Sequence, residues 1–70
     1  MNETLINFIK QRRKRAGLIQ QDLADQADMG LRFVRDLEQG KQTVRMDKVN
    51  QVLALFGHQL APMPVKRDNQ

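Results

Sequence analysis

Cysteine and serine are absent from this 70-residue sequence, and histidine occurs once, as His58. Without cysteine the chain has neither a disulfide framework nor a thiolate metal site, and it is compatible with a reducing compartment. Few side chains can act as a nucleophile or a base, so we expect no enzyme and no catalytic residue. His58 has no neighbours at metal-ligand spacing, and we expect neither a metal nor a cofactor.

Aromatic residues and long apolar runs are also scarce. Phe8, Phe33 and Phe56 are the only large rings, although 40% of the residues are hydrophobic. A chain of this size is near the lower limit for folding on its own core and often gains from dimerisation. No apolar run approaches the roughly 20 residues that span a bilayer, and the N-terminus lacks the features of a secretory signal. We expect one small domain with no membrane partner, located in the cytoplasm and associated with the nucleoid.

Positive charge is in excess, with 12 lysines and arginines against 8 acidic residues, a net charge of +4. Such an excess favours an anionic partner, either nucleic acid or an acidic protein surface. A basic run falls at the end of the first predicted helix: Lys10, Arg12, Arg13, Lys14 and Arg15. Cations there also complement the helix dipole, so a merely solvated helix end is an equally good interpretation.

Apolar residues recur at helical spacing in four segments of the chain. This spacing predicts helices over about 5–15, 20–26, 31–39 and 46–56. Thr4 is the expected N-cap of the first helix, and Gly17, Gly40 and Gly57 suit the ends of the first, third and fourth. The predicted fold is all-α, with four or five short helices and a tight turn between the second and third.

The segment after Gly57 contains Pro62 and Pro64, which exclude a helix but permit an edge strand. In an extended chain both prolines remove donors from one edge, and the other edge keeps its amides. An antiparallel pairing with the same segment of a second copy would give a homodimer. The residues assigned to this contact are Gln59, Leu60, Ala61, Met63 and Val65. A frayed tail is the alternative.

The segment LIQQDLADQADMGLRFVRDLEQGK, residues 18–41, resembles the Xre-type helix-turn-helix of phage repressors and Cro proteins, which have a lambda-repressor-like fold. That family is patterned Leu-Thr-Gln-x-x-Leu-Ala, then a Gly-Val-Ser-like turn, then Ile-x-x-(Ile/Leu)-Glu-x-Gly. The sequence departs from the pattern at Ile19, Asp28 and Gly30, which replace a capping residue, the turn glycine and a second capping residue. A lost capping side chain costs on the order of 1 kcal/mol, and less when glycine replaces it.

The fourth helix and the proline-containing strand are similar to those of HipB-type antitoxins, whose C-terminal strands pair across a dimer. Such proteins repress their own operon and bind a HipA-like serine/threonine kinase toxin. The resemblance therefore implies a homodimer, a palindromic operator in double-stranded DNA and a kinase partner. We divide the chain into a helix-turn-helix domain at 1–57, a dimerisation strand at 58–65 and a disordered tail at 66–70.

The resemblance implies that the helix at 31–39 enters the major groove of DNA, where its first residues face the bases. The expected base contacts are Leu31, Arg32, Phe33 and Asp36. The expected phosphate contacts are Gln20, Arg35, Lys41, Thr43 and Arg45. Arg13 and Glu38 match a pair that forms a salt bridge between helices in many relatives.

Several of these residues have a second interpretation. The planar fork of Arg32 can donate to guanine O6 and N7, or Arg32 can form a weak surface pair with Asp36. Phe33 can contact a thymine methyl group or pack on Met29. The charged residues of the loop after Gly40 can contact phosphate or be solvated, and Asp22, Asp25, Asp28 and Asp36 are interpreted as solvated.

Two other functions are compatible with this sequence. A free-standing phage-type repressor would have no toxin partner. A protein-interaction module would use Leu31 and Phe33 as an exposed apolar anchor. RNA is a less suitable partner, because no aromatic residues are arranged on a strand for base stacking.

Overall fold

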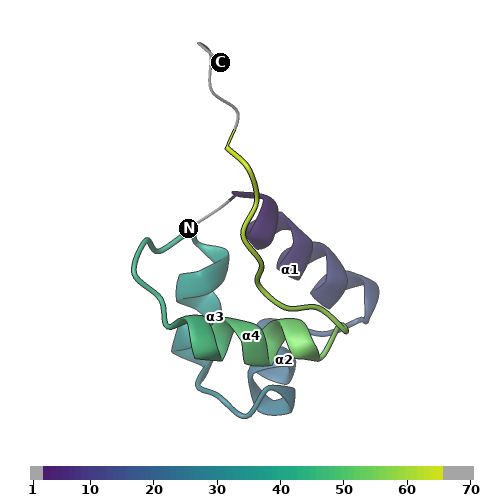
Figure 1. Ribbon diagram of the computed structural model, residues 1–70. Coiled ribbons are helices and arrows are strands. Elements are labelled where there is room, and N and C mark those ends of the chain that lie inside the picture. The colour runs from purple at the N-terminus through teal and green to yellow at the C-terminus, as the bar shows by residue number, and fades with distance from the viewer. Residues whose placement is uncertain (1–2, 66–70) are drawn as a thin grey trace.

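Four short helices form the computed structural model of the protein, which describes residues 3–65 (Figure 1). They are α1 (Glu3–Arg15), α2 (Gln20–Gln26), α3 (Leu31–Glu38) and α4 (Met46–Ala54). No strand occurs within this described range. The predicted all-α class is confirmed. The described residues form four helices, where four or five were expected. The tail expected at 66–70 lies outside the described residues.

The helix ends agree with the apolar pattern to within two residues. α1 begins at Glu3, so the prediction of Thr4 as its N-cap is wrong. The Glu3 carboxylate complements the helix dipole in the first turn. α4 ends at Ala54, earlier than expected, and a turn follows in which the His58 N–H donates to the Leu53 carbonyl at 3.0 Å. Gly57 has φ +72° in this turn, a left-handed conformation that favours glycine.

One apolar cluster at the centre of the molecule joins all four helices. Each helix contributes the face on which its apolar residues recur. The buried members are Ile9, Leu23, Ala24, Ala27, Val34, Leu37, Val49, Val52 and Leu53. The three phenylalanines are only partly buried and pack around this cluster, so the core consists of aliphatic side chains.

The turn between α2 and α3 has an unusual backbone conformation at Asp28. Its φ is +57°, and it is the only non-glycine residue of the described chain with positive φ. The next amide, of Met29, donates to the Ala24 carbonyl at 2.9 Å and closes the end of α2. The resemblance places a glycine at this position, and the positive φ gives the physical reason.

We expect Asp28→Gly to raise the free energy of unfolding by about 0.5–1 kcal/mol. Glycine relieves the left-handed strain, which costs roughly 1–2 kcal/mol, and the greater freedom of the unfolded chain offsets part of the gain. Asp28→Ala should instead lower the stability, because alanine tolerates positive φ less well than aspartate. Urea denaturation followed by circular dichroism measures both variants. If the free energy of unfolding changes in the same direction in both variants, the loss of the Asp28 side chain determines the effect, and the backbone conformation does not.

The C-terminal segment 58–65 runs back across the helices beside α1 in Figure 1. The Leu60 N–H donates to Asn50 Oδ1 of α4 at 2.8 Å, and the Leu60 side chain packs on the central cluster. The His58 ring lies 4.6 Å from the Phe8 ring between centroids. Within one chain the segment forms no strand, and its pairing with a second copy stays a prediction.

Candidate nucleic-acid interface

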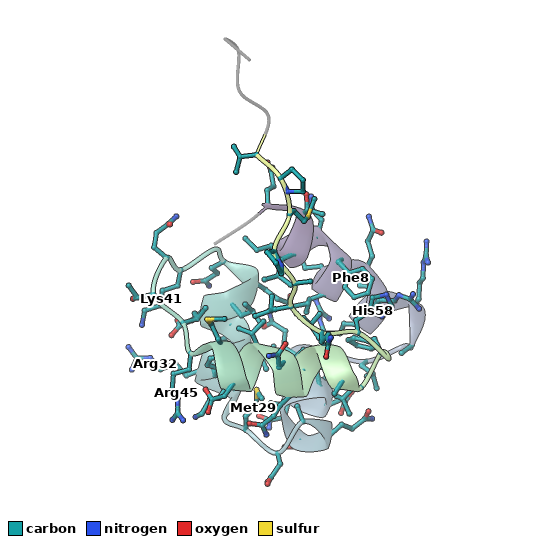
Figure 2. The ribbon with its side chains drawn as sticks, viewed as in Figure 1. Phe8, Met29, Arg32, Lys41, Arg45 and His58 are labelled. Carbon is teal, nitrogen blue, oxygen red and sulfur yellow. The ribbon has the colours of Figure 1, made fainter. Side chains whose placement is uncertain are left out.

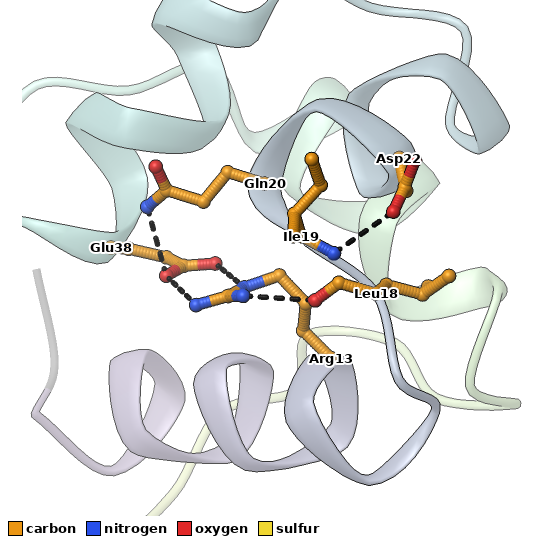
Figure 3. A network of polar contacts seen from close by, with 6 residues as sticks. All are labelled: Arg13, Leu18, Ile19, Gln20, Asp22 and Glu38. Carbon is orange, nitrogen blue, oxygen red and sulfur yellow. Dashed lines mark hydrogen bonds and ion pairs between the residues drawn. The ribbon is translucent and has the colours of Figure 1, made fainter.

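A network of polar contacts fixes the start of α2 against the ends of α1 and α3 (Figure 3). Arg13 donates from Nε and Nη2 to the two carboxylate oxygens of Glu38, at 2.8 and 3.0 Å. Its Nη1 donates to the Leu18 carbonyl at 3.0 Å. The Glu38 side chain is 2% exposed and that of Arg13 is 12% exposed. The resemblance implied this ion pair, and its bidentate geometry is the stronger form of the contact.

Gln20 belongs to the same network, which the sequence did not indicate. Its Nε2 donates to Glu38 Oε1 at 3.1 Å, so the side chain expected to contact phosphate already has a protein partner. A primary amide carries two N–H donors, and one hydrogen bond to Glu38 leaves the second for another acceptor. The position of Gln20 is therefore set by α3 before any ligand is bound.

The N-cap residue of α2 is Ile19, whose side chain cannot accept a hydrogen bond. The Asp22 carboxylate, three residues later, accepts from the Ile19 N–H at 3.0 Å. This is one half of a capping box, and it compensates in part for the departure from the family pattern at Ile19. The interpretation of Asp22 as merely solvated is wrong. The spacing between the cap and an acidic residue was the signal that sequence reasoning missed.

The face of α3 that is turned away from the core carries Arg32, an expected base contact, and Arg35, an expected phosphate contact. Arg32 and Arg35 are exposed, and Leu31 is half-buried. Phe33 is also half-buried, because its ring packs on the central cluster, and the Lys48 ammonium lies 5.7 Å from the ring centroid. Only part of the Phe33 ring therefore faces solvent. Lys48 was not among the predicted residues.

Asp36 pairs with Lys41 and not with Arg32. Lys41 Nζ lies 3.5 Å from Asp36 Oδ2, and no ion pair within residues 3–65 includes Arg32. The alternative interpretation of Arg32, a surface pair with Asp36, is therefore wrong. The guanidinium of Arg32 is exposed with no carboxylate partner in this range.

The loop between α3 and α4 places further cations on the same side of the molecule. Figure 2 shows Arg32, Lys41 and Arg45 together, away from Phe8 and His58. Arg45 donates to both oxygens of Asp47, at 3.1 and 2.7 Å. The hydrogen bond from Arg45 lowers the pKa of the Asp47 carboxyl below its usual value.

The other predicted residues lie at two separate places. Thr43 is exposed in the same loop as Lys41. In the C-terminal segment Leu60 is half-buried, and Gln59, Ala61, Met63 and Val65 are exposed. The segment borders an apolar groove, and Leu5, Phe8 and Leu53 form part of its opposite wall.

None of the helices within residues 3–65 has the length and apolar character needed to cross a membrane. The same residues contain no group of three or more histidine, cysteine, aspartate or glutamate side chains arranged to hold a metal ion.

The chain belongs to the helix-turn-helix domain family, which matches residues 5–63. This confirms the prediction of a helix-turn-helix domain, while the Xre-type and HipB-type assignments stay predictions. A similar protein is an uncharacterised HTH-type transcriptional regulator of Sinorhizobium fredii, 51% identical over 45 residues. The matched part covers 64% of this chain and 59% of the relative, so the chain spans about three fifths of that relative's length. No solved structure matches the chain.

Proposed function

We propose that this protein is a sequence-specific DNA-binding repressor of transcription that acts as a homodimer on a palindromic operator. The helix-turn-helix family and the name of the regulator from Sinorhizobium fredii support DNA-binding regulation. The observation that carries the proposal is the exposed guanidinium of Arg32 at the start of α3, which has no carboxylate partner within residues 3–65. A planar donor at that place is suited to a guanine edge in the major groove.

The packing of α3 supports this use of the helix. Val34 and Leu37 are buried in the core, which leaves the face with Arg32 and Arg35 open. Lys41, Thr43 and Arg45 flank that face from the following loop, and phosphate contacts of this kind position a protein without specifying sequence. Gln20 would contribute its second amide hydrogen to a phosphate at the start of α2.

The C-terminal segment supports a dimer. No hydrogen bond within residues 3–65 uses the amides of Ala61, Met63 or Val65, and these are the donors on the edge without proline. Met63 and Val65 also expose most of their apolar surface. A second copy would supply carbonyl acceptors for these amides, and it would also cover the exposed apolar side chains. Two copies would then set their α3 helices about one turn of DNA, roughly 34–36 Å, apart.

We further propose an antitoxin role, in which the same dimer holds a HipA-like serine/threonine kinase toxin on surfaces away from the DNA. This step is based on the HipB resemblance alone. A free-standing phage-type repressor is the alternative, and the absence of a kinase gene beside this gene would favour it. The salt dependence of DNA binding distinguishes both repressor hypotheses from a protein-interaction module, because binding to phosphate weakens steeply with ionic strength.

The central test is Arg32→Ala. We expect the variant to lose about 1–3 kcal/mol of discrimination between the operator and random DNA, since a bidentate contact to guanine contributes that much. Fluorescence anisotropy at two salt concentrations measures it, with a duplex from upstream of the gene and a random duplex of equal length. Arg32 is exposed and has no ion pair, so the fold should be unaffected.

Arg35→Ala is the matched control, because it removes the same charge from the same helix. If Arg35 contacts phosphate, its loss weakens binding to both duplexes by a similar factor and leaves the preference unchanged. Binding of the native protein to the upstream duplex that is no tighter than to random DNA would contradict the proposed function. Such a result would favour the protein-interaction module.

A further inference from the structure

α1 carries two lysines without an acidic partner, Lys10 and Lys14, which we call the α1 strip. They are four residues apart and therefore neighbours on one face of the helix. Lys14 is exposed and Lys10 is half-buried. The ion pairs within residues 3–65 join Arg13 to Glu38, Lys41 to Asp36 and Arg45 to Asp47. No carboxylate of this range neutralises the α1 strip.

The α1 strip lies beside the junction of α3 and the loop that follows it. Arg13, three residues after Lys10, contacts Glu38 at the end of α3. Ile6, four residues before Lys10, places its Cδ1 only 3.3 Å from where a Cβ on Gly40 would be. Residues at these spacings share one side of a helix. Lys10 is therefore on the side of α1 that meets the start of the loop.

Arg12 and Arg15, two further cations of α1, face elsewhere. The Arg12 guanidinium lies 5.2 Å from the centre of the Phe8 ring, and that ring packs on His58 of the C-terminal segment. Arg15 is five residues after Lys10, which corresponds to about 140° around the helix. The basic run that the sequence indicated is thus divided between different faces. Lys10 adjoins the start of the loop of Lys41, and Lys14 is one turn further along the same face of α1.

We propose that the α1 strip is an additional contact to the DNA backbone, made by Lys10 and Lys14 to phosphates next to those that the loop approaches. This inference is based on the proposed DNA-binding function. A lysine ammonium acts on phosphate as a point charge and requires no base sequence. The network of Arg13, Glu38 and Gln20 holds α1 firmly against the two helices of the motif, so the strip keeps a fixed position relative to α3.

The test compares the salt dependence of DNA binding by the native protein, Lys10→Gln/Lys14→Gln and Arg15→Gln. Each phosphate contact contributes about 0.9 to the slope of log K against log salt concentration. We expect the double variant to have a slope shallower by about 1.8 on the upstream duplex and on a random duplex. Arg15→Gln should leave the slope unchanged. Glutamine and lysine have similar helix propensity, and circular dichroism checks that each variant is folded.

The outcomes separate this inference from the function on which it is based. If the double variant keeps the native slope while the native protein binds the upstream duplex, the α1 strip is not a contact and the proposed function stands. If Arg15→Gln reduces the slope by as much per charge removed as the double variant does, the effect comes from the overall positive charge of the protein, and the assigned contact is wrong. If the native protein shows no salt-dependent DNA binding, both proposals are wrong.

Discussion

Glu38→Ala is expected to lower the free energy of unfolding by about 3–5 kcal/mol, because it leaves the largely buried guanidinium of Arg13 without its counter-charge. Two hydrogen bonds from Arg13 and one from Gln20 end on this carboxylate. Domains are typically stable by only about 5–15 kcal/mol, so this variant will be close to unfolding. The midpoint of urea denaturation, followed by circular dichroism, measures the loss.

A double variant, Arg13→Met/Glu38→Leu, is the control for that result. It removes both charges and fills much of the same space, and buried ion pairs replaced in this way often lose little stability or gain some. We expect it to be more stable than Glu38→Ala. A loss of less than about 1 kcal/mol for Glu38→Ala itself, the value of an exposed pair, would show that the contact is not important for the fold.

If the proposed homodimer forms through its C-terminal segments, removal of the residues after Leu60 is expected to give a folded monomer and to weaken binding to the proposed operator by a factor of about 10²–10⁴. The shortened chain keeps Leu60, whose side chain packs on the core and whose amide binds Asn50. It loses the unpaired amides of Ala61, Met63 and Val65. The large effect on binding follows because two linked half-sites bind with a high effective concentration.

Analytical ultracentrifugation gives the oligomeric state, and anisotropy with the upstream duplex gives the affinity. A chain that ends at Val65 is the matched control, and it should stay dimeric because it keeps the whole proposed strand. If the chain that ends at Leu60 sediments as a dimer, the pairing of C-terminal strands is wrong. The dimer contact must then be sought on the helices.

Most of the fold was predictable because the apolar residues of each helix fall on one face. Helical spacing reports which side of a segment is buried, and it placed Leu23, Val34, Leu37 and Val52 in the core. The end of α4 was less certain, since Phe56 continues the apolar pattern although it lies in the turn after the helix. Burial and helical conformation are separate properties, and the pattern detects only the first.

The polar contacts were less predictable because they join residues far apart in the chain. Gln20 and Glu38 are separated by 18 positions, and no local pattern relates them. Helical spacing alone divides the basic run of α1 into different faces, but the face that meets the loop was known only from the packing of Ile6 on Gly40. Asp22 and Asp28 are different, because their roles are local. The capping role of Asp22 could be predicted from its spacing to Ile19. The positive φ of Asp28 could be predicted from the position of the family's turn glycine, so neither role required the tertiary structure.

The hydrogen bond between Gln20 and Glu38 has a consequence for the entropy of association. A glutamine side chain that becomes ordered loses rotamer freedom with a free-energy cost of up to about 1.5–2 kcal/mol. Here much of that freedom is lost when the protein folds, because α3 already restrains the amide. A phosphate that accepts the second N–H of Gln20 would therefore meet a side chain already in place, and little of this ordering cost would be subtracted from the binding energy.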